Sequence, residues 1–513
     1  MNRFYTNYFK WGNKVYIRGY TEEQPGNYVP FIDNYLLNDI SLYTIDDNAN
    51  SGKKSLFGKR NLKEHKFKTA KDATNFIEQN KEFKEIYGYP KFENIKIKEL
   101  FGHSKPVPPK IKVLYFDIET YVSDDTDHGR KCVNSFPNVF VPEHEINLIT
   151  SIIDDKIYVY ALESVDTAWQ QSQLNARGYG HLYKLFVQEF KSERDLLNAW
   201  VKLIQKEFPD IITGWNIETF DIPYIHSRMS KHFTEEQIGN LSPFGIVTTR
   251  NTRDDFGNSI KLVNIKGISC LDYLHVYKKF ELENRPNFKL ETICQIELGV
   301  GKLEYEGSFR QFYKTKFGRE FTLYNIIDVI RVKELDRVCG FLDVAYEMAY
   351  ESLCNFNDIM SVTRLWDNIL YSALHDKGIE LPSFVDAEQR EYEGAFVKEP
   401  LTGKYEFLVT FDVASLYPST IIQNNISPET IYEGTKLDLR PYDVTNRTDK
   451  FRVAQKFARD NDLALCSNGV LFHKHDRGII PELLQKYGVK RNEIKRTLKG
   501  RQRLVEYAKT KLR

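Results

Sequence analysis

Residues 111–119, IKVLYFDIE, decide how this chain is organised. The run 111–116 has the apolar, β-branched and aromatic character of a strand, and it leads directly into Asp117 and Glu119. Because side chains alternate along a strand, these two carboxylates share one face at its end. Carboxylates so close repel each other unless a cation lies between them. A solvent-exposed loop would give the same short pattern. Further motifs in the chain are therefore needed to distinguish a cation site from such a loop.

A proline-rich segment separates this strand from what precedes it. Residues 104–110, SKPVPPK, hold three prolines within four positions, and proline is excluded from helix interiors and central strands. We therefore expect a domain boundary near residue 110. From 111 to about 340, strand-like runs alternate with helical stretches, for example 192–207 followed by 211–213. This alternation favours an α/β or mixed sheet covered by helices.

Composition indicates a globular chain of several domains. The 513 residues, 41% of them hydrophobic and 28% charged, suffice for about three domains with their own cores. This excludes a small disulfide-dependent scaffold, a collagen and a mainly disordered chain. Six cysteines lie far apart without a CxxC pair, so we expect buried thiols in a reducing compartment rather than a zinc site. No signal peptide or membrane-spanning run is evident, which favours a soluble intracellular protein.

Basic residues are concentrated at the end of the sequence. The net charge of the whole chain is only +1, so any nucleic-acid contact needs local clusters. Residues 481–513 predict one long helix, interrupted at Gly488 and Gly500. From 486 to 513 there are eleven basic and two acidic residues, a net charge of +9, which leaves −8 for the rest of the chain.

Two further acidic motifs follow the first. Residues 214–221, GWNIETFD, come after the strand-like run 211–213 and end in Asp221. Residues 324–328, YNIID, place Tyr324 and Asp328 at i and i+4, on one face of a helix. Each motif alone has an ordinary structural explanation. Together, D-x-E, N-x₃-F-D and Y-x₃-D follow the order found in proofreading 3′→5′ exonucleases.

Residues 111–340 therefore resemble the exonuclease domain of a family B DNA polymerase, and the fit is best to T-even-like bacteriophages. The resemblance implies an RNase H-like domain that hydrolyses phosphodiesters with two Mg²⁺ ions, Mn²⁺ being an alternative. It implies that Asp117 bridges both ions, that Glu119 and Asp328 complete the first, and that Asp221 serves the second. Tyr324 would orient the attacking water. Hard oxygen ligands of this kind suit two Mg²⁺ ions about 4 Å apart.

A second motif extends the resemblance to the polymerase itself. Residues 412–419, DVASLYPS, follow a β-rich run that we expect to end at Asp412, and they match motif A of family B polymerases. Asp412 can ligate Mg²⁺ together with the carbonyl of Val413. The backbone amides of Ser415 and Leu416 can form a nest for nucleotide phosphates. By resemblance, Tyr417 packs under the sugar and excludes a ribose 2′-OH.

Two weaker matches complete the candidate residues. Residues 392–395, YEGA, match a YxG(G/A) element that touches template DNA in the family, through Tyr392 and Gly394; a structural turn is the alternative. The basic helix resembles the first fingers helix, where Arg491 and Lys495 share a face that can bind triphosphate oxygens. A solvent-exposed basic helix is the alternative.

These residues hold only half of a polymerase site. Two-metal phosphoryl transfer needs a second carboxylate opposite Asp412, and neither the family's motif C nor its second fingers helix, motif B, occurs here. We therefore expect a fragment, or one subunit of a split polymerase completed by a C-terminal partner chain. The expected α/β and α+β domains are an N-terminal domain of residues 1–110 with 341–385, an exonuclease domain of 111–340, a partial palm of 386–470 and a partial fingers domain of 471–513.

The resemblance also implies partners and a location. It implies primer–template and single-stranded DNA, dNTPs, a sliding clamp and other replisome proteins, in the cytoplasm of an infected bacterium. A different class of function also fits the sequence: an RNA- or replisome-binding module with vestigial catalysis.

Overall fold

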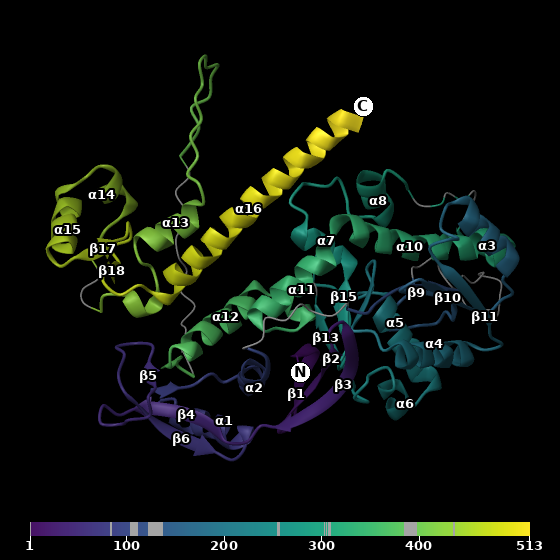
Figure 1. The fold of residues 1–513 in the computed structure, drawn as a ribbon, viewed down its shortest axis with the longest axis horizontal. Coiled ribbons are helices and arrows are strands. Elements are labelled where there is room, and N and C mark those ends of the chain that lie inside the picture. Colours follow the sequence, from purple (N-terminus) through teal and green to yellow (C-terminus); the bar gives the residue numbers. More distant parts are fainter. Residues whose placement is uncertain are drawn as a thin grey trace. The chain divides into compact units, whose positions relative to one another are not determined.

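The structure is a computed structural model (Figure 1). It describes residues 2–82, 85–102, 111–121, 137–253, 257–301, 303, 305, 309–383, 398–433 and 437–512. The chain forms two compact units, Met1–Leu37 with Lys91–Ile369 and Asn38–Pro90 with Leu370–Arg513. Mixed α/β structure runs through both. The four domain limits expected from the sequence stay a prediction, and the proline-rich segment 104–110 lies outside the described residues.

A six-stranded mixed sheet, in the order β11-β10-β9-β8-β12-β15, forms the centre of the first unit. β8, β12 and β15 are parallel to one another, while β9 is antiparallel to both β8 and β10. Every residue of β9 is buried, as expected for a central strand with both faces covered. The strands are β8 Val113–Thr120, β9 Ile146–Ile153, β10 Lys156–Ala161, β11 Lys184–Glu189, β12 Ile211–Gly214 and β15 Ser269–Asp272.

Helices cover both faces of this sheet. On one face, α4 (Glu193–Glu207) and α5 (Asp221–His232) pack on alternate side chains of β8 such as Leu114 and Phe116. On the other, α10 (Thr322–Cys339) and α11 (Phe341–Ser352) pack with Tyr115. The remaining helical elements of this unit are α2 Phe92–Phe101, α3 Thr167–Ala176, α6 Glu235–Gly239, α7 Tyr273–Phe280, α8 Leu290–Leu298, α9 Phe309–Lys316, η1 Phe317–Phe321, η2 Phe356–Met360 and most of α12 Val362–Asp376.

Two antiparallel assemblies complete the first unit. β1 (Asn2–Trp11), β2 (Lys14–Gln24) and β3 (Asn27–Leu36) form a meander, and β13 (Val247–Arg253) pairs with β14 (Ser259–Ile265) in a hairpin. Arg18 of β2 is fully buried and forms an ion pair with Asp210 at 3.0 Å. That buried pair joins the meander to the segment that enters β12.

The second unit is built from smaller sheets and helices. A three-stranded sheet in the order β6-β4-β7 is covered by α1, whose first turn is capped by Thr69. β5 pairs in parallel with β16, and β17 pairs in antiparallel fashion with β18. The elements are β4 Ile40–Ile45, β5 Lys54–Ser55, β6 Leu62–Phe67, α1 Ala70–Asn80, β7 Ile86–Tyr87, β16 Ile379–Glu380, α13 Leu416–Gln423, η3 Pro428–Thr430, α14 Pro441–Thr445, α15 Asp449–Asp460, β17 Leu463–Leu465, β18 Leu471–His473 and α16 Ile479–Leu512.

Two expectations about this unit are wrong. α16 runs from Ile479 to Leu512 without a break (Figure 1), and a Cβ added at Gly488 or Gly500 would meet no atom of another element within 4 Å. The run before Asp412 is not a strand: Phe407 and Phe411 are 98% and 91% exposed. A strand needs a hydrogen-bonding neighbour, and none of the described residues supplies one here.

The structure also bears on two compositional expectations. The five cysteines within the described residues are all free thiols, but only Cys294 and Cys354 are buried, while Cys270, Cys339 and Cys466 are half-buried. Among the described helices, none combines the length and apolar character needed to cross a bilayer.

Candidate active sites

Asp117 and Glu119 project from β8 at the centre of the main sheet. Both side chains are half-buried, while Phe116 and Ile118 on the opposite face are buried. Asp221 opens α5 and is buried, and its Oδ1 accepts a hydrogen bond of 3.2 Å from the backbone N–H of Ile118. Ile118 lies between Asp117 and Glu119 on β8, so its hydrogen bond holds Asp221 beside these two carboxylates.

The electrostatics of this pair are unfavourable without a cation. Burial raises the pKa of Asp221 well above its usual range, and the charge of Asp117 is the next cause. The N–H of Ile118 acts in the opposite direction but does not compensate. A positive ion placed between Asp221 and Asp117 would stabilise the charged form of both carboxylates.

α10 brings the third motif to the same strand. Asn325 is fully buried and donates a 2.6 Å hydrogen bond from Nδ2 to Oδ2 of Asp117. Asp328 is buried and lies three residues further along α10, on the same side of the helix. Tyr324 is half-buried, and its ring packs edge-on against the rings of Tyr305, Phe309 and Phe312.

The donor chemistry fits a hard divalent cation, although the ligand set is not closed. Among the described residues, no three Asp, Glu, His or Cys side chains group closely enough to hold a metal ion. Asp117 and Asp221 are adjacent, and the amide of Asn325 occupies one oxygen of Asp117. Carboxylate oxygens are the ligands that Mg²⁺ and Mn²⁺ prefer.

Asp272, which belongs to none of the three acidic motifs, is a positioning residue. Its carboxylate accepts backbone hydrogen bonds from Asn216 at 2.9 Å and Glu218 at 3.1 Å, and it also caps α7. It therefore fixes the loop that carries Asp221. In the sequence it stands at the end of a strand-like run and directly before a helical stretch.

The motif A residues are placed very differently. Asp412 lies in exposed coil, and Val413 and Tyr417 are 59% and 74% exposed. Ser415 has a left-handed backbone, φ +52°, and Leu416 begins α13 there. Among the described residues, Asp412 belongs to no group of three or more acidic, histidine or cysteine side chains that could hold a metal ion. Tyr392 and Gly394 lie outside the described residues.

Arg491 and Lys495 are exposed on α16, one turn apart. The start of that helix is firmly anchored, because Asn425 accepts from Gly478 N–H at 2.9 Å and Glu429 accepts from Ile479 N–H at 2.6 Å. These two side chains cap the helix and join it to the segment after motif A.

Comparisons with known proteins agree with both halves of this description. A family model described as DNA polymerase family B, exonuclease domain, matches residues 58–293, and one described as DNA polymerase family B matches residues 363–510. This chain belongs to family B of the DNA polymerases. The DNA-directed DNA polymerase of Escherichia phage RB69 is 33% identical over 421 residues, 79% of this chain and 44% of the relative.

Two further relatives are similar to this chain over a smaller share of its length. The DNA-directed DNA polymerase of Enterobacteria phage T4 is 33% identical over 381 residues, 71% of this chain and 41% of the relative. The DNA polymerase of Pyrococcus glycovorans is 28% identical over 331 residues, 63% of this chain and 38% of the relative. This family B chain thus spans less than half the length of the curated relatives it matches.

The family matches also divide the candidate residues. Asp117, Glu119 and Asp221 fall inside the exonuclease match, and Asp412 falls inside the polymerase match. Asp328 falls between the two matches, so its link to the site rests on the position of α10. Family B polymerases and their exonuclease domains generally use divalent metal ions.

Proposed function

We propose that this chain is a 3′→5′ proofreading exonuclease that removes nucleotides from the 3′ ends of DNA by two-metal hydrolysis. The observation that carries the proposal is the buried Asp221, held by Ile118 N–H beside Asp117 in a repulsive pair. The mixed sheet supports it: antiparallel β9 beside parallel β8, β12 and β15 is an arrangement consistent with an RNase H-like fold.

The chain's own residues have distinct parts in this reaction. Asp117, Glu119, Asp221 and Asp328 would hold two Mg²⁺ ions, which supply an activated water and neutralise charge at the phosphate. Asn325 orients the carboxylate of Asp117 through the bond to Oδ2. Tyr324 would position the attacking water through its hydroxyl. The buried surroundings of Asp221 keep water away from the carboxylates on the side of α5.

Digestion of a 5′-labelled single strand of DNA with Mg²⁺ tests this proposal. The double change Asp117→Ala with Glu119→Ala should remove divalent-dependent digestion, since two of the four ligands are lost. A matched control changes two exposed acids at the start of α6, Glu235→Ala with Glu236→Ala, and should digest normally. Undiminished digestion by the first variant would overturn the proposal. Tight RNA binding by a wild-type chain that digests nothing would favour a binding module instead.

We further propose that this chain contributes half of a DNA-directed DNA polymerase site. Asp412 and the Val413 carbonyl would bind Mg²⁺, and the amides of Ser415 and Leu416 would bind dNTP phosphates. Tyr417 would select the sugar. Arg491 and Lys495 would contact the triphosphate, and Tyr392 and Gly394 the template. The other half, with motifs B and C, would come from a C-terminal polypeptide, and the assembly would act with a sliding clamp in the cytoplasm of an infected bacterium.

Exposed apolar side chains support this second proposal. Phe407, Leu408 and Phe411 in the run before Asp412 are each at least 79% exposed. On α16, Ile494, Leu498 and Leu504 are 58%, 53% and 68% exposed. Exposed apolar side chains gathered along one segment are typical of an interface.

Complementation is the appropriate assay. Alone, the chain should show no templated nucleotide addition; mixed with a polypeptide carrying motifs B and C, it should form a 1:1 complex that extends primers. Asp412→Ala should abolish extension and spare digestion, because the two sites use different carboxylates. Efficient extension by the chain alone, or failure of the two polypeptides to associate, would contradict the proposal.

A further inference from the structure

A cavity of about 430 Å³ lies at the opposite end of the main sheet from the exonuclease carboxylates. Its wall includes Lys266 and Ile268, just before β15 begins, together with β1, the start of α2 and η2. Ser269 is level with Ile211 and Val113 across the parallel strands. Asp117 stands four residues further along β8, about 13 Å at the rise of a strand. The cavity is therefore separate from the proposed nuclease site.

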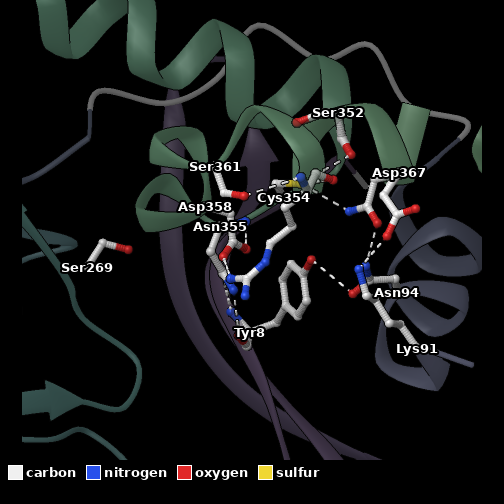
Figure 2. A network of polar contacts seen from close by, with 12 residues as sticks. Tyr8, Lys91, Asn94, Ser269, Ser352, Cys354, Asn355, Asp358, Ser361 and Asp367 are labelled. Carbon is white, nitrogen blue, oxygen red and sulfur yellow. Dashed lines mark hydrogen bonds and ion pairs between the residues drawn. The ribbon is translucent and has the colours of Figure 1, made fainter. Parts of the chain in front are cut away.

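The polar wall of this cavity is preorganised (Figure 2). Asn355 accepts from the backbone N–H of Tyr8 and donates to its carbonyl, both at 2.8 Å, like a neighbouring strand. The hydroxyl of Tyr8 donates to the carbonyl of Leu353 at 3.0 Å. Asn94 donates to Asn368 at 2.5 Å. These bonds hold the wall in place without a ligand.

The charges on the wall do not balance. Four cationic side chains line the cavity, against two acids, Glu93 and Asp358. Asp358 pairs with Arg364, and Lys91 pairs with Asp367 at 2.5 Å.

Lys10 and Lys266, the other two cations, have no carboxylate partner within the described part of the chain. Each lies over an aromatic ring, Lys10 over Phe92 at 5.5 Å and Lys266 over Phe9 at 5.6 Å from the ring centre. Lys266 is half-buried, and burial is the cause that lowers its pKa. A cation–π contact compensates only part of such a loss of hydration. An anion in the cavity would supply the missing partner.

The uncharged polar side chains of the wall indicate what kind of molecule bears the anionic group. Asn264 and Asn357 line the cavity and make no side-chain hydrogen bond to another described residue. Asparagine amides offer a donor and an acceptor together, which is the pattern that reads the edge of a nucleobase. A cavity of this size also falls in the range that holds a small organic ligand rather than a bare ion.

We propose that this cavity binds a nucleotide, with its phosphate between Lys10 and Lys266 and its base edge toward Asn264 and Asn357. The shared chemistry is a phosphate on a nucleoside, either free or within a single strand. The proposal does not rest on the exonuclease assignment, because the two sites lie at opposite ends of the sheet and share no residue.

Calorimetric titration of the full chain without divalent ions tests the proposal, with AMP, adenosine and a short oligothymidylate as probes. Lys10→Gln with Lys266→Gln should weaken binding of the phosphate-bearing probe by about tenfold per lysine. The matched control is Lys14→Gln with Lys261→Gln. Lys261 is likewise half-buried on β14, but it bonds Ser227 and does not line the cavity.

The outcomes separate the sources of the phosphate. Binding of AMP but not adenosine, lost in the first variant and kept in the control, supports a free nucleotide. The same pattern with the oligonucleotide alone supports a strand. Equal effects of both variants, equal affinity for adenosine and AMP, or no binding of any probe would overturn the proposal.

A labelling experiment needs no variant. Acetylation of Lys10 and Lys266 in the wild-type chain should slow when the bound probe is present, while Lys14 and Lys261 react at unchanged rates. Mass spectrometry reads each lysine separately. Unprotected Lys10 and Lys266 at a saturating probe concentration would count against the site.

Discussion

Replacing Arg18 by methionine should strongly destabilise the first unit. Arg18 is 1% exposed, forms an ion pair with Asp210 at 3.0 Å, and donates to the carbonyls of Phe208, Pro209 and Gly267 at 2.9–3.1 Å. Methionine fills much of the volume but leaves the three carbonyls without this donor and the buried carboxylate of Asp210 without its cation. Breaking a buried pair from one side costs about 3–5 kcal/mol.

We expect the lower end of that range, about 3 kcal/mol, because Asp210 keeps two other donors. These are the hydroxyl of Tyr20 at 2.9 Å and the N–H of Lys112 at 2.9 Å. The matched control is Arg3→Met in the same meander, where Arg3 and Asp33 are 33% and 38% exposed. A pair so exposed is worth about 0–1 kcal/mol.

Urea denaturation followed by circular dichroism measures both free energies of unfolding. Adding Asp210→Asn to Arg18→Met should recover part of the loss, since the orphaned charge is removed. Equal destabilisation by Arg18→Met and Arg3→Met would refute the reasoning, as would a double variant no more stable than Arg18→Met.

Local patterns in the sequence predicted the elements that carry the nuclease candidates. The strand with Asp117 and Glu119 is β8, the stretch 192–207 is α4 with its Ser192 cap, and Tyr324 and Asp328 lie on α10. In each case the side chains repeat with the period of the element, and neighbours nearby in sequence decide the conformation.

Features that depend on distant partners were not predictable in this way. The bond from Asn325 to Asp117 and the tie from Asp272 to residues 216 and 218 join segments far apart in the chain. The run before Asp412 has strand propensity but no neighbouring strand among the described residues, so propensity alone gives an exposed coil. The glycines of α16 were expected to interrupt it, although an isolated glycine costs a helix only about 1 kcal/mol.

Two further predictions concern Gly488 and Asp221. Gly488→Ala should stabilise α16 by about 0.5–1 kcal/mol, because an added Cβ meets no atom within 4 Å; a loss of helical signal would contradict an unbroken helix. Asp221→Asn should raise the melting temperature near neutral pH without divalent ions. The pKa of Asp221 is raised in the folded chain, so the unfolded chain loses this proton at lower pH. Stability is therefore greatest below the unfolded pKa and falls as pH rises through the folded one, and the amide removes that fall. Mg²⁺ should reverse the order by stabilising the carboxylate and not the amide. Melting curves from pH 4 to 8, with and without Mg²⁺, measure both effects, and Asp33→Asn at a half-exposed pair is the control. If the two variants respond alike, the buried repulsion between Asp221 and Asp117 does not exist, and the reason for placing a cation there disappears with it.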